Sequence, residues 1–261
     1  MRRRFESALR QARTAKLPFS CPGPAFSGEV FVLYYLDVRP ARFVSRPNRF
    51  VARVEQEGRI FAAHVKNTGR CAELLLPGAR VYLEYSRNPA RKTPCDLIAV
   101  EKERPGLPPL LINMDSAAPN AVAAEWLAAG GLGPLEGLRP EYPLGDSRFD
   151  FYAEERGRPV LIEVKGCTLE RDGVALFPDA PTLRGLKHVR ELTALARRGW
   201  RCCVLFVIQM KGPRRFAPNR ATQPAFAQAL QDAAAAGVEV LARDCLAAPD
   251  ALRIDGEVGV E

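Results

Sequence analysis

Seven consecutive apolar residues, Cys-Cys-Val-Leu-Phe-Val-Ile at positions 202–208, constrain the fold of this chain more than any other feature. A strand that is apolar at every position has to be covered on both faces, as a central strand is in a sheet flanked by helices. Helices are expected on either side of it in sequence, over residues 186–198 and 224–236, the second closed by Gly237. The run therefore predicts a mixed α/β domain in which Cys202 and Cys203 are core residues and not a reactive pair.

The segment before this run supplies the rest of the predicted domain, which we place at residues 114–261. Asn120 is expected to cap a helix over residues 121–129 that ends at two glycines. Strands are expected near residues 139–143, 147–153 and 159–165, and a last strand over residues 238–242. This order, with helices between strands, is compatible with a restriction-endonuclease-like core.

Two acidic residues and a lysine lie on the two strands that a turn over residues 154–159 joins. Alternation places Phe149 and Phe151 on one side of the first strand and Asp150 on the other. On the second strand Glu163 and Lys165 are two residues apart and therefore share a face. With ordinary pairing of this hairpin, Asp150 and Glu163 converge near the strand ends.

This trio has the chemistry of a metal-dependent nuclease site. Two carboxylates with a backbone carbonyl between them suit a hard cation such as Mg²⁺. A phosphodiester-cleaving site also needs a nearby cation, which Lys165 supplies, to orient a water or stabilise developing charge. The alternative is that Glu163 and Lys165 form an ordinary solvated ion pair, worth ~0–1 kcal/mol. Gln209, at the end of the apolar run, either reaches the metal site or simply ends a strand at the surface.

The first part of the chain, residues 39–113, is predicted to form a small β-barrel or meander. Short strand-like runs over residues 50–54, 59–65, 80–85, 96–101 and 110–113 are separated by turn signals that contain Gly, Asn and Pro. Residues 1–38 form a basic N-terminal extension, for which a disordered tail and an overlong gene model are both open readings.

A formal charge of +8 and a pI of 9.3 favour polyanionic partners, and nucleic acid is the natural candidate. Basic residues in the first domain are interleaved with aromatic ones that serve either base stacking or the core. Basic side chains near residue 184 lie at the start of a predicted helix, where the helix dipole is positive and a further positive charge is unfavourable. Either a phosphate bound there or pairing with Asp179 or Glu191 would offset this repulsion. The expected contacts are Arg46, Arg49, Lys66, Arg70, Arg91 and Lys92 in the first domain, and Arg148, Arg184, Lys187 and His188 in the second.

Several other classes of protein are excluded or disfavoured. Seven cysteines without a Cys-x-x-Cys pair fit neither a disulfide framework nor a zinc ribbon and indicate a reducing cytoplasm. Only two histidines are present, so a metal is left to oxygen ligands. The basic N-terminus lacks the apolar stretch of a secretory signal, and the apolar run nearest to it, residues 30–36, is too short to span a bilayer. No membrane association is expected.

Four motifs, in the expected order, resemble the sugar fermentation stimulation protein family over roughly residues 40–245. They are Arg-Pro-Asn-Arg-Phe at 46–50, His-Val-Lys-Asn-Thr-Gly-Arg at 64–70, Glu-Val-Lys-Gly-Cys-Thr-Leu at 163–169 and Phe-Pro-Asp-Ala-Pro-Thr-Leu-Arg-Gly-Leu-Lys-His at 177–188. The chain departs from the family pattern at Thr68, where proline is expected, and at Gln223, where aspartate is expected. Residues 1–38 have no recognised counterpart.

The resemblance implies an OB-like domain followed by a PD-(D/E)XK nuclease-like domain, in DNA-binding proteins linked by name to sugar utilisation. It assigns Asp150, Glu163 and Lys165 as the catalytic trio and adds Glu141 as a further acidic candidate for the metal. We therefore predict a cytoplasmic Mg²⁺- or Mn²⁺-dependent nuclease that binds DNA or RNA. A non-cleaving DNA-binding regulator and a protein-binding adaptor are the alternatives, and the oligomeric state, a homodimer included, is left open.

Overall fold

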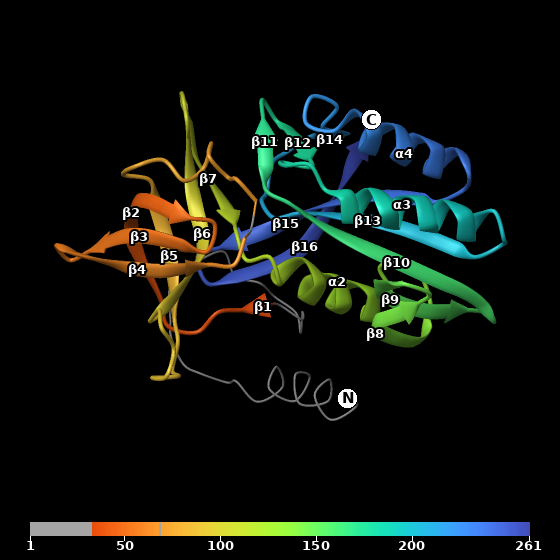
Figure 1. The fold of residues 1–261 in the computed structure, drawn as a ribbon, viewed down its shortest axis with the longest axis horizontal. Helices are drawn as coiled ribbons and strands as arrows, with labels where there is room; N and C mark the ends of the chain where they lie inside the picture. Colours follow the sequence, from red (N-terminus) through yellow and green to blue (C-terminus); the bar gives the residue numbers. More distant parts are fainter. Residues whose placement is uncertain (1–32, 68) are drawn as a thin grey trace. The chain divides into compact units, whose positions relative to one another are not determined.

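The computed structural model describes residues 33–261 except Thr68, and these residues form one compact unit. Most of the expected N-terminal extension lies outside the described residues. Its last part belongs to the fold, because β1 (Leu33–Tyr34) pairs with the C-terminal strand β16 (Ala251–Val260). The fold is mixed α/β, with more strand than helix, as predicted (Figure 1). The boundary that we place between residues 113 and 114 stays a prediction.

The first sheet closes into a small barrel. Its strands are β2 (Val38–Asn48), β3 (Val51–Gln56), β4 (Arg59–Val65), β5 (Arg80–Tyr85), β6 (Cys95–Arg104) and β7 (Leu107–Asn113), in the order β4-β3-β2-β5-β6-β7. A parallel pairing of β4 with β6 joins the ends of the five-strand path. The sequence predicted β4 and β5 with these bounds but missed β2, which contains Pro40 and Pro47, residues that weaken a strand signal.

The second sheet has ten strands and carries the helices. Its order is β11 (Leu169–Arg171), β12 (Val174–Phe177), β14 (Arg215–Pro218), β16, β15 (Glu239–Ala248), β13 (Arg201–Ile208), β10 (Arg158–Cys167), β9 (Ser147–Glu155) and β8 (Glu136–Leu144), with β1 beside β16. Strand β13 runs parallel to both neighbours, β10 and β15, and residues 202–208 are all buried. The prediction of a central strand covered on both faces is confirmed.

Three helices cover the two faces of this sheet (Figure 1). Helices α3 (Leu183–Ala196) and α4 (Pro224–Ala235) pack on one face, where Val189 and Phe226 join the larger core cluster. Helix α2 (Ala118–Ala128) packs on the other face through Val122. The described residues contain no helix with the length and apolarity that a membrane crossing requires.

Helix α2 begins three residues earlier than expected, which changes the role of Asn120. Its N-cap is Ala117, without a side-chain hydrogen bond, and Pro119 occupies the first turn, a position where a missing N–H costs nothing. Asn120 therefore lies inside the helix, so the prediction that it caps the helix was wrong. Its side chain is left available for another partner.

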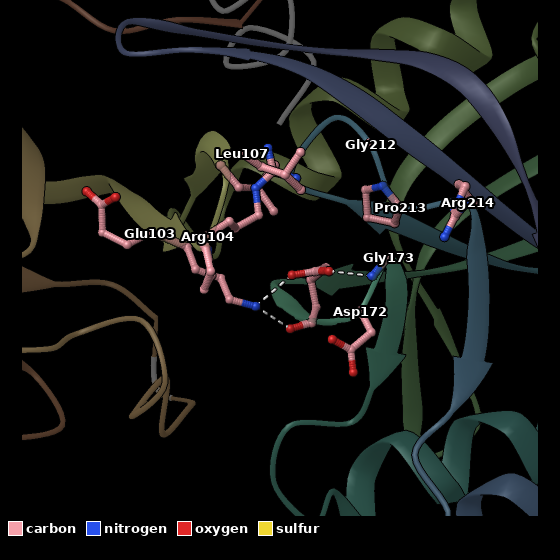
Figure 2. A pocket seen from close by; sticks show the side chains of 12 residues that line it. Glu103, Arg104, Leu107, Asp172, Gly173, Gly212, Pro213 and Arg214 are labelled. Atoms are coloured by element: carbon pink, nitrogen blue, oxygen red, sulfur yellow. Dashed lines mark hydrogen bonds and ion pairs between the residues drawn. The ribbon is translucent and has the colours of Figure 1, made fainter.

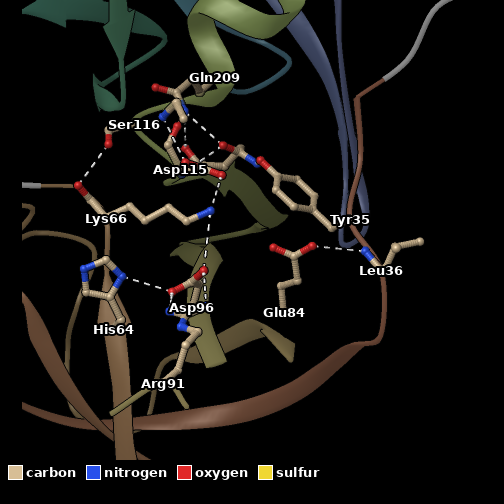
Figure 3. Close-up of polar contacts among 12 residues, drawn as sticks. Tyr35, Leu36, His64, Lys66, Glu84, Arg91, Asp96, Asp115, Ser116 and Gln209 are labelled. Carbon is tan, nitrogen blue, oxygen red and sulfur yellow. Dashed lines mark hydrogen bonds and ion pairs between the residues drawn. The ribbon is translucent and has the colours of Figure 1, made fainter. Parts of the chain in front are cut away.

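A polar network joins the barrel to the second sheet (Figure 3). Lys66, at the end of β4, donates to Asp115 Oδ2 at 2.9 Å, and Asp115 lies in the connection between β7 and α2. Lys66 also lies 3.5 Å from Asp96, which accepts a hydrogen bond from Arg91 and one of 3.0 Å from His64 Nδ1. The carboxylate of Asp96 is thus the common partner of three side chains.

Replacing this carboxylate should destabilise the protein in a pH-dependent way. Burial by itself raises the pKa of Asp96, but hydrogen bonds from Arg91 and His64 outweigh it and hold the pKa below its usual value of 3.8. The stabilisation is therefore present above pH 3.8 and is lost as the pH falls further. We expect Asp96→Asn to lower the free energy of unfolding by about 1–3 kcal/mol at pH 7. The difference in Tm from wild type should shrink below pH 3.8.

Asp37→Asn is the matched control for this prediction, since it removes the same charge from an exposed carboxylate that pairs with Arg39. An exposed pair contributes ~0–1 kcal/mol. A difference in Tm between Asp96→Asn and wild type that stays constant from pH 7 to pH 3 would contradict the assignment.

A second contact between the two sheets lies beside a pocket of about 600 Å³ (Figure 2). Lys102 on β6 donates to the backbone oxygen and to Oε2 of Glu170 on β11, both at 2.6 Å. Charged side chains of both signs line this pocket: Lys102, Arg104, Arg214, Glu103, Glu170 and Asp172. Because the three cations are balanced by three anions, the pocket has no net attraction for a polyanion.

Candidate active site

Asp150 lies where the ladder between β9 and β10 ends. The register runs from Arg158↔Glu155 to Ile162↔Phe151. Beyond the last pair, the backbone N–H of Val164 donates to Asp150 Oδ2 at 2.8 Å. A side-chain carboxylate thus takes the place of the backbone oxygen that would accept this hydrogen bond in a regular ladder. The other oxygen, Oδ1, accepts from Asn120 Nδ2 at 2.8 Å.

The regular alternation expected around Asp150 is broken. Phe149 packs in the core cluster that contains α3 and α4, whereas Phe151 packs in the cluster that contains α2. The prediction that the two rings share a face was therefore wrong. Glu141, which lies opposite Asp150 on the neighbouring strand β8, has a φ of +53°, so the backbone of β8 is also irregular at this point.

Glu163 is a buried carboxylate with one occupied and one free oxygen. Its side chain is 3% exposed. Oε1 accepts from Lys165 Nζ and lies 2.5 Å from His188 Nδ1 on α3. Oε2 is buried and has no hydrogen-bond partner among the described residues. A buried carboxylate oxygen without a donor is costly, so a ligand is the physical explanation to test first.

The two carboxylates influence each other electrostatically. Burial and the negative charge of Glu163 raise the pKa of Asp150, although the Val164 amide and Lys165 act in the opposite direction. Burial alone would raise the pKa of Glu163 as well, but the hydrogen bond with His188 and the charge of Lys165 lower it. The structure therefore brings Asp150, Glu163 and Lys165 together, as the hairpin predicted.

These residues fit a hard divalent cation, although they do not form a complete cage. The unpartnered Glu163 Oε2 offers an oxygen ligand, and a cation beside it would offset the repulsion that raises the pKa of Asp150. No group of three or more His, Cys, Asp or Glu side chains arranged to hold a metal occurs among the described residues. The remaining ligands would be backbone oxygens, waters or substrate oxygens, which Mg²⁺ commonly keeps.

Glu141 and Gln209 lie outside this buried pair. The Glu141 side chain is 68% exposed, and its carboxylate is 3.7 Å from Arg148. Gln209 uses its amide nitrogen to hold the connection between the sheets, donating to both oxygens of Asn113 and to the backbone oxygen of Asp115 at 2.9–3.1 Å. The structure therefore gives Gln209 a part in joining the barrel to the second sheet, and none of its hydrogen bonds to described residues involves the two carboxylates.

Gly166 follows Lys165 at the point where Gln209 and α2 meet β10. A Cβ at this position would lie 2.6 Å from Gln209 Oε1 and 2.6 Å from the Pro119 ring, closer than side chains tolerate. We expect Gly166→Ala to lower the free energy of unfolding by about 1–3 kcal/mol because the ring cannot move without shifting α2. Denaturant unfolding measures this change.

Gly259→Ala is the control, since a Cβ on that strand glycine meets no atom within 4 Å. Equal stability of the two variants would show that the close packing at Gly166 does not constrain the protein.

Three of the side chains predicted to contact nucleic acid already bind other groups of the protein. The Arg46 guanidinium donates to four backbone oxygens, of Arg49, Asn67, Gly69 and Arg70. Arg91 and Lys66 bind buried carboxylates. These three side chains hold the barrel and its loops together, so the prediction that they are free to contact nucleic acid is not supported by their geometry.

The other predicted contacts divide into exposed and buried residues. Arg49, Arg70, Lys92, Arg148, Arg184 and Lys187 are exposed. Lys187 lies 3.6 Å from Glu191, which is the competing explanation that the sequence left open for it. His188 is 3% exposed and contacts Glu163 and the Phe149 ring, so it is not placed to meet a phosphate at the surface. Among the aromatics, Phe50 is exposed beside Arg49, whereas Tyr82 is buried.

Two residues that support the site have roles that their sequence context did not predict. Asn120, read as a helix cap, donates to Asp150 instead. His188, read as a phosphate contact, binds Glu163. The only local signal was the apolar spacing of α3, in which His188 falls on the same face as Leu192 and Val189.

Two family models match this chain. The model described as "Sugar fermentation stimulation protein RE domain" matches residues 117–251, and the model described as "SfsA N-terminal OB domain" matches residues 44–107. The barrel is therefore an OB domain, and the second sheet lies in the domain that follows it.

Curated relatives and a solved structure agree with these models. The sugar fermentation stimulation protein homolog of Desulfitobacterium hafniense (strain Y51) is 48% identical over 227 residues, which cover 87% of this chain and 97% of that protein. The homolog of Clostridium beijerinckii is 45% identical over 228 residues, with 87% and 98% covered. The structure of Pyrococcus furiosus SfsA in complex with Ca²⁺ has a TM-score of 0.78 and 28% identity, covering 88% of this chain and 99% of that one. From these matches over most of its length, the chain belongs to the sugar fermentation stimulation protein family.

Proposed function

We propose that this protein is a metal-dependent nuclease, in which Asp150 and Glu163 hold Mg²⁺ or Mn²⁺ beside Lys165. The observation that carries the proposal is the buried Glu163 Oε2, which has no hydrogen-bond partner while Oε1 accepts from two side chains. A related protein of the same fold, from Pyrococcus furiosus, has been solved in complex with Ca²⁺, which supports an oxygen-ligand cation site. The substrate class is DNA or RNA.

Each residue of the site has a distinct task in this proposal. A divalent ion at the two carboxylates would polarise a phosphoryl oxygen and acidify a water. Asn120 and the Val164 amide fix the orientation of Asp150, and His188 fixes that of Glu163. Lys165, 16% exposed, orients the attacking water or stabilises negative charge that develops on the phosphate.

The described cysteines support the expected cytoplasmic location. Six of them are resolved as free thiols, and all six are buried. Burial raises the pKa of Cys71 and Cys95 to about 12, so these thiols are not reactive at neutral pH. Unpaired cysteines of this kind are typical of reducing compartments.

A cleavage panel tests the proposal. Duplex, branched and single-stranded DNA, and RNA, are incubated with the protein and Mg²⁺, Mn²⁺ or EDTA. We expect cleavage of at least one substrate with metal and none with EDTA, and we expect Lys165→Ala to abolish cleavage while nucleic-acid binding persists. Cleavage that Lys165→Ala leaves unchanged would refute the role of this residue.

A second candidate function is a DNA-binding regulator that uses the nuclease fold without cleaving. It is favoured by the lack of a third acidic ligand beside Asp150 and Glu163 in the described part of the chain. It predicts binding without cleavage of any substrate in the panel with any of the metals. The third alternative, a protein-binding adaptor, predicts little dependence of nucleic-acid affinity on salt.

A further inference from the structure

Positive charge on the described helices is confined to α3. The three helices α2, α3 and α4 contain three lysines and arginines, and all three are on α3: Arg184, Lys187 and Arg190. Two more, Arg197 and Arg198, follow directly at its C-terminal end. All five side chains are exposed. We call these five residues the α3 basic face.

The five residues lie along one side of the helix. Spacings of three, three and seven residues from Arg184 to Arg197 repeat close to the helical period, so these side chains form a row, and Arg198 follows directly after it at the C-terminal end of the helix. The opposite side of α3 is buried and contains Leu186, His188, Val189 and Leu192. At a rise of 1.5 Å per residue, the row is roughly 20 Å long. Glu191, partly buried, is the only acidic residue within α3.

This charge is mostly uncompensated within the described part of the protein. Lys187 has two partners, Glu191 at 3.6 Å and the Asp146 backbone oxygen at 3.4 Å. The side chains of the four arginines make no hydrogen bond or ion pair with another described residue. Arg46 and Arg91, in contrast, make hydrogen bonds inside the barrel, Arg46 to four backbone oxygens and Arg91 to the Asp96 carboxylate. A row of like charges in which only Lys187 has an acidic partner among the described residues is unfavourable in the free protein and favours an anionic partner.

The α3 basic face begins beside the candidate active site. His188, on the buried side of the same helix, contacts Glu163. Lys187 reaches the Asp146 backbone oxygen in the turn that leads into β9, four residues before Asp150. A polyanion bound along the row toward the N-terminus of α3 would therefore reach the edge of the candidate active site.

We propose that the α3 basic face binds the phosphate backbone of duplex DNA, an inference that rests on the proposed nuclease function for its link to the active site. Arginine binds phosphate through paired N–H donors, so a row of arginines suits a regular backbone. Single-stranded nucleic acid is bound largely by stacking on aromatic rings. The exposed positions of α3 contain no aromatic residue, and Leu183 and Ala194 are the only apolar ones. The surface therefore favours a duplex over a single strand.

Binding measured without cleavage tests this inference. The variant is Arg190→Gln/Arg197→Gln/Arg198→Gln, which leaves every residue of the two-carboxylate site in place. The probes are a labelled duplex of mixed sequence and its single strand, titrated in EDTA over a range of salt concentrations. The matched control is Arg53→Gln/Arg59→Gln/Arg87→Gln, which removes three exposed charges from the barrel. Thermal melting of all proteins verifies that each is folded.

We expect the α3 variant to lose about 2–3 units from the slope of log affinity against log salt, and roughly 100-fold or more in duplex affinity at 0.1 M salt. The barrel variant should keep the slope of wild type and a duplex affinity within a few fold of it. An unchanged slope for the α3 variant would overturn the inference, as would an equal or larger loss for the barrel variant. An equal loss for single-stranded and duplex DNA would overturn the choice of a duplex.

Failure of this inference and failure of the nuclease proposal are distinguishable. If the α3 variant loses duplex binding but wild type cleaves nothing with any metal, the surface is supported and the nuclease proposal fails. If wild type cleaves and the α3 variant binds duplex with an unchanged slope, the nuclease proposal stands and the surface is wrong.

Discussion

Glu163→Gln is expected to reduce metal-dependent cleavage by about 10³-fold or more, which corresponds to a loss of about 4 kcal/mol of transition-state stabilisation. Glutamine keeps the shape of the side chain but removes the negative charge that would hold a divalent cation at Oε2. Because Oε2 has no protein partner, this oxygen is free to bind the ion. Single-turnover cleavage with Mn²⁺ measures the effect.

A stability measurement separates metal binding from catalysis in this variant. A cation that binds only the folded protein raises its Tm, by an amount that grows with the logarithm of the ratio of its concentration to its dissociation constant. We expect Mn²⁺ or Ca²⁺ to raise the Tm of wild type and to leave that of Glu163→Gln unchanged. Glu136→Gln is the matched control, since Glu136 is exposed at the start of β8 and should behave as wild type. A wild-type Tm that does not respond to any divalent cation would argue against the site.

His188→Ala is expected to lower both stability and activity. The substitution removes a donor from a buried carboxylate and leaves a cavity beside Phe149, at a cost of about 2–4 kcal/mol in the free energy of unfolding. Residues that orient a metal ligand typically change metal affinity or activity by roughly 10–100-fold when they are removed. We therefore expect half-maximal cleavage to require more metal.

His188→Asn distinguishes positioning from packing in this prediction. The asparagine amide places a donor near the position of Nδ1, but it does not replace the ring that packs on Phe149. We expect His188→Asn to recover much of the metal response while it stays less stable than wild type. If it needs as much metal as His188→Ala, the hydrogen bond to Glu163 does not orient this ligand.

Short-range patterns in the sequence predicted the strands that alternate regularly between turns. Strands β4 and β5 and the central β13 were found with their bounds or within one or two residues of them. The strands that were missed have weak local signals. Prolines interrupt β2, and β1 is only two residues long and is paired with a strand more than two hundred residues away.

The candidate site was found from spacing, but its detailed geometry was not. The hairpin predicted that Asp150, Glu163 and Lys165 meet, and they do. The same alternation placed Phe149 and Phe151 on one face, which was wrong because the two rings pack in different core clusters on either side of Asp150. A pattern of polar and apolar residues does not show where a side chain replaces a backbone group in the ladder.

The sequence by itself determined the positive charge, which follows from composition alone, and the acid-acid-lysine array and the buried central strand, which depend on residues that are close together in the chain. Tertiary structure alone decided which oxygen of Glu163 stays free and which basic residues stay exposed. The partners concerned are distant in sequence: His188 is 25 residues from Glu163, and Asn113 is 96 residues from Gln209. Such contacts depend on how helices and sheets pack together, and local periodicity carries no information about that packing.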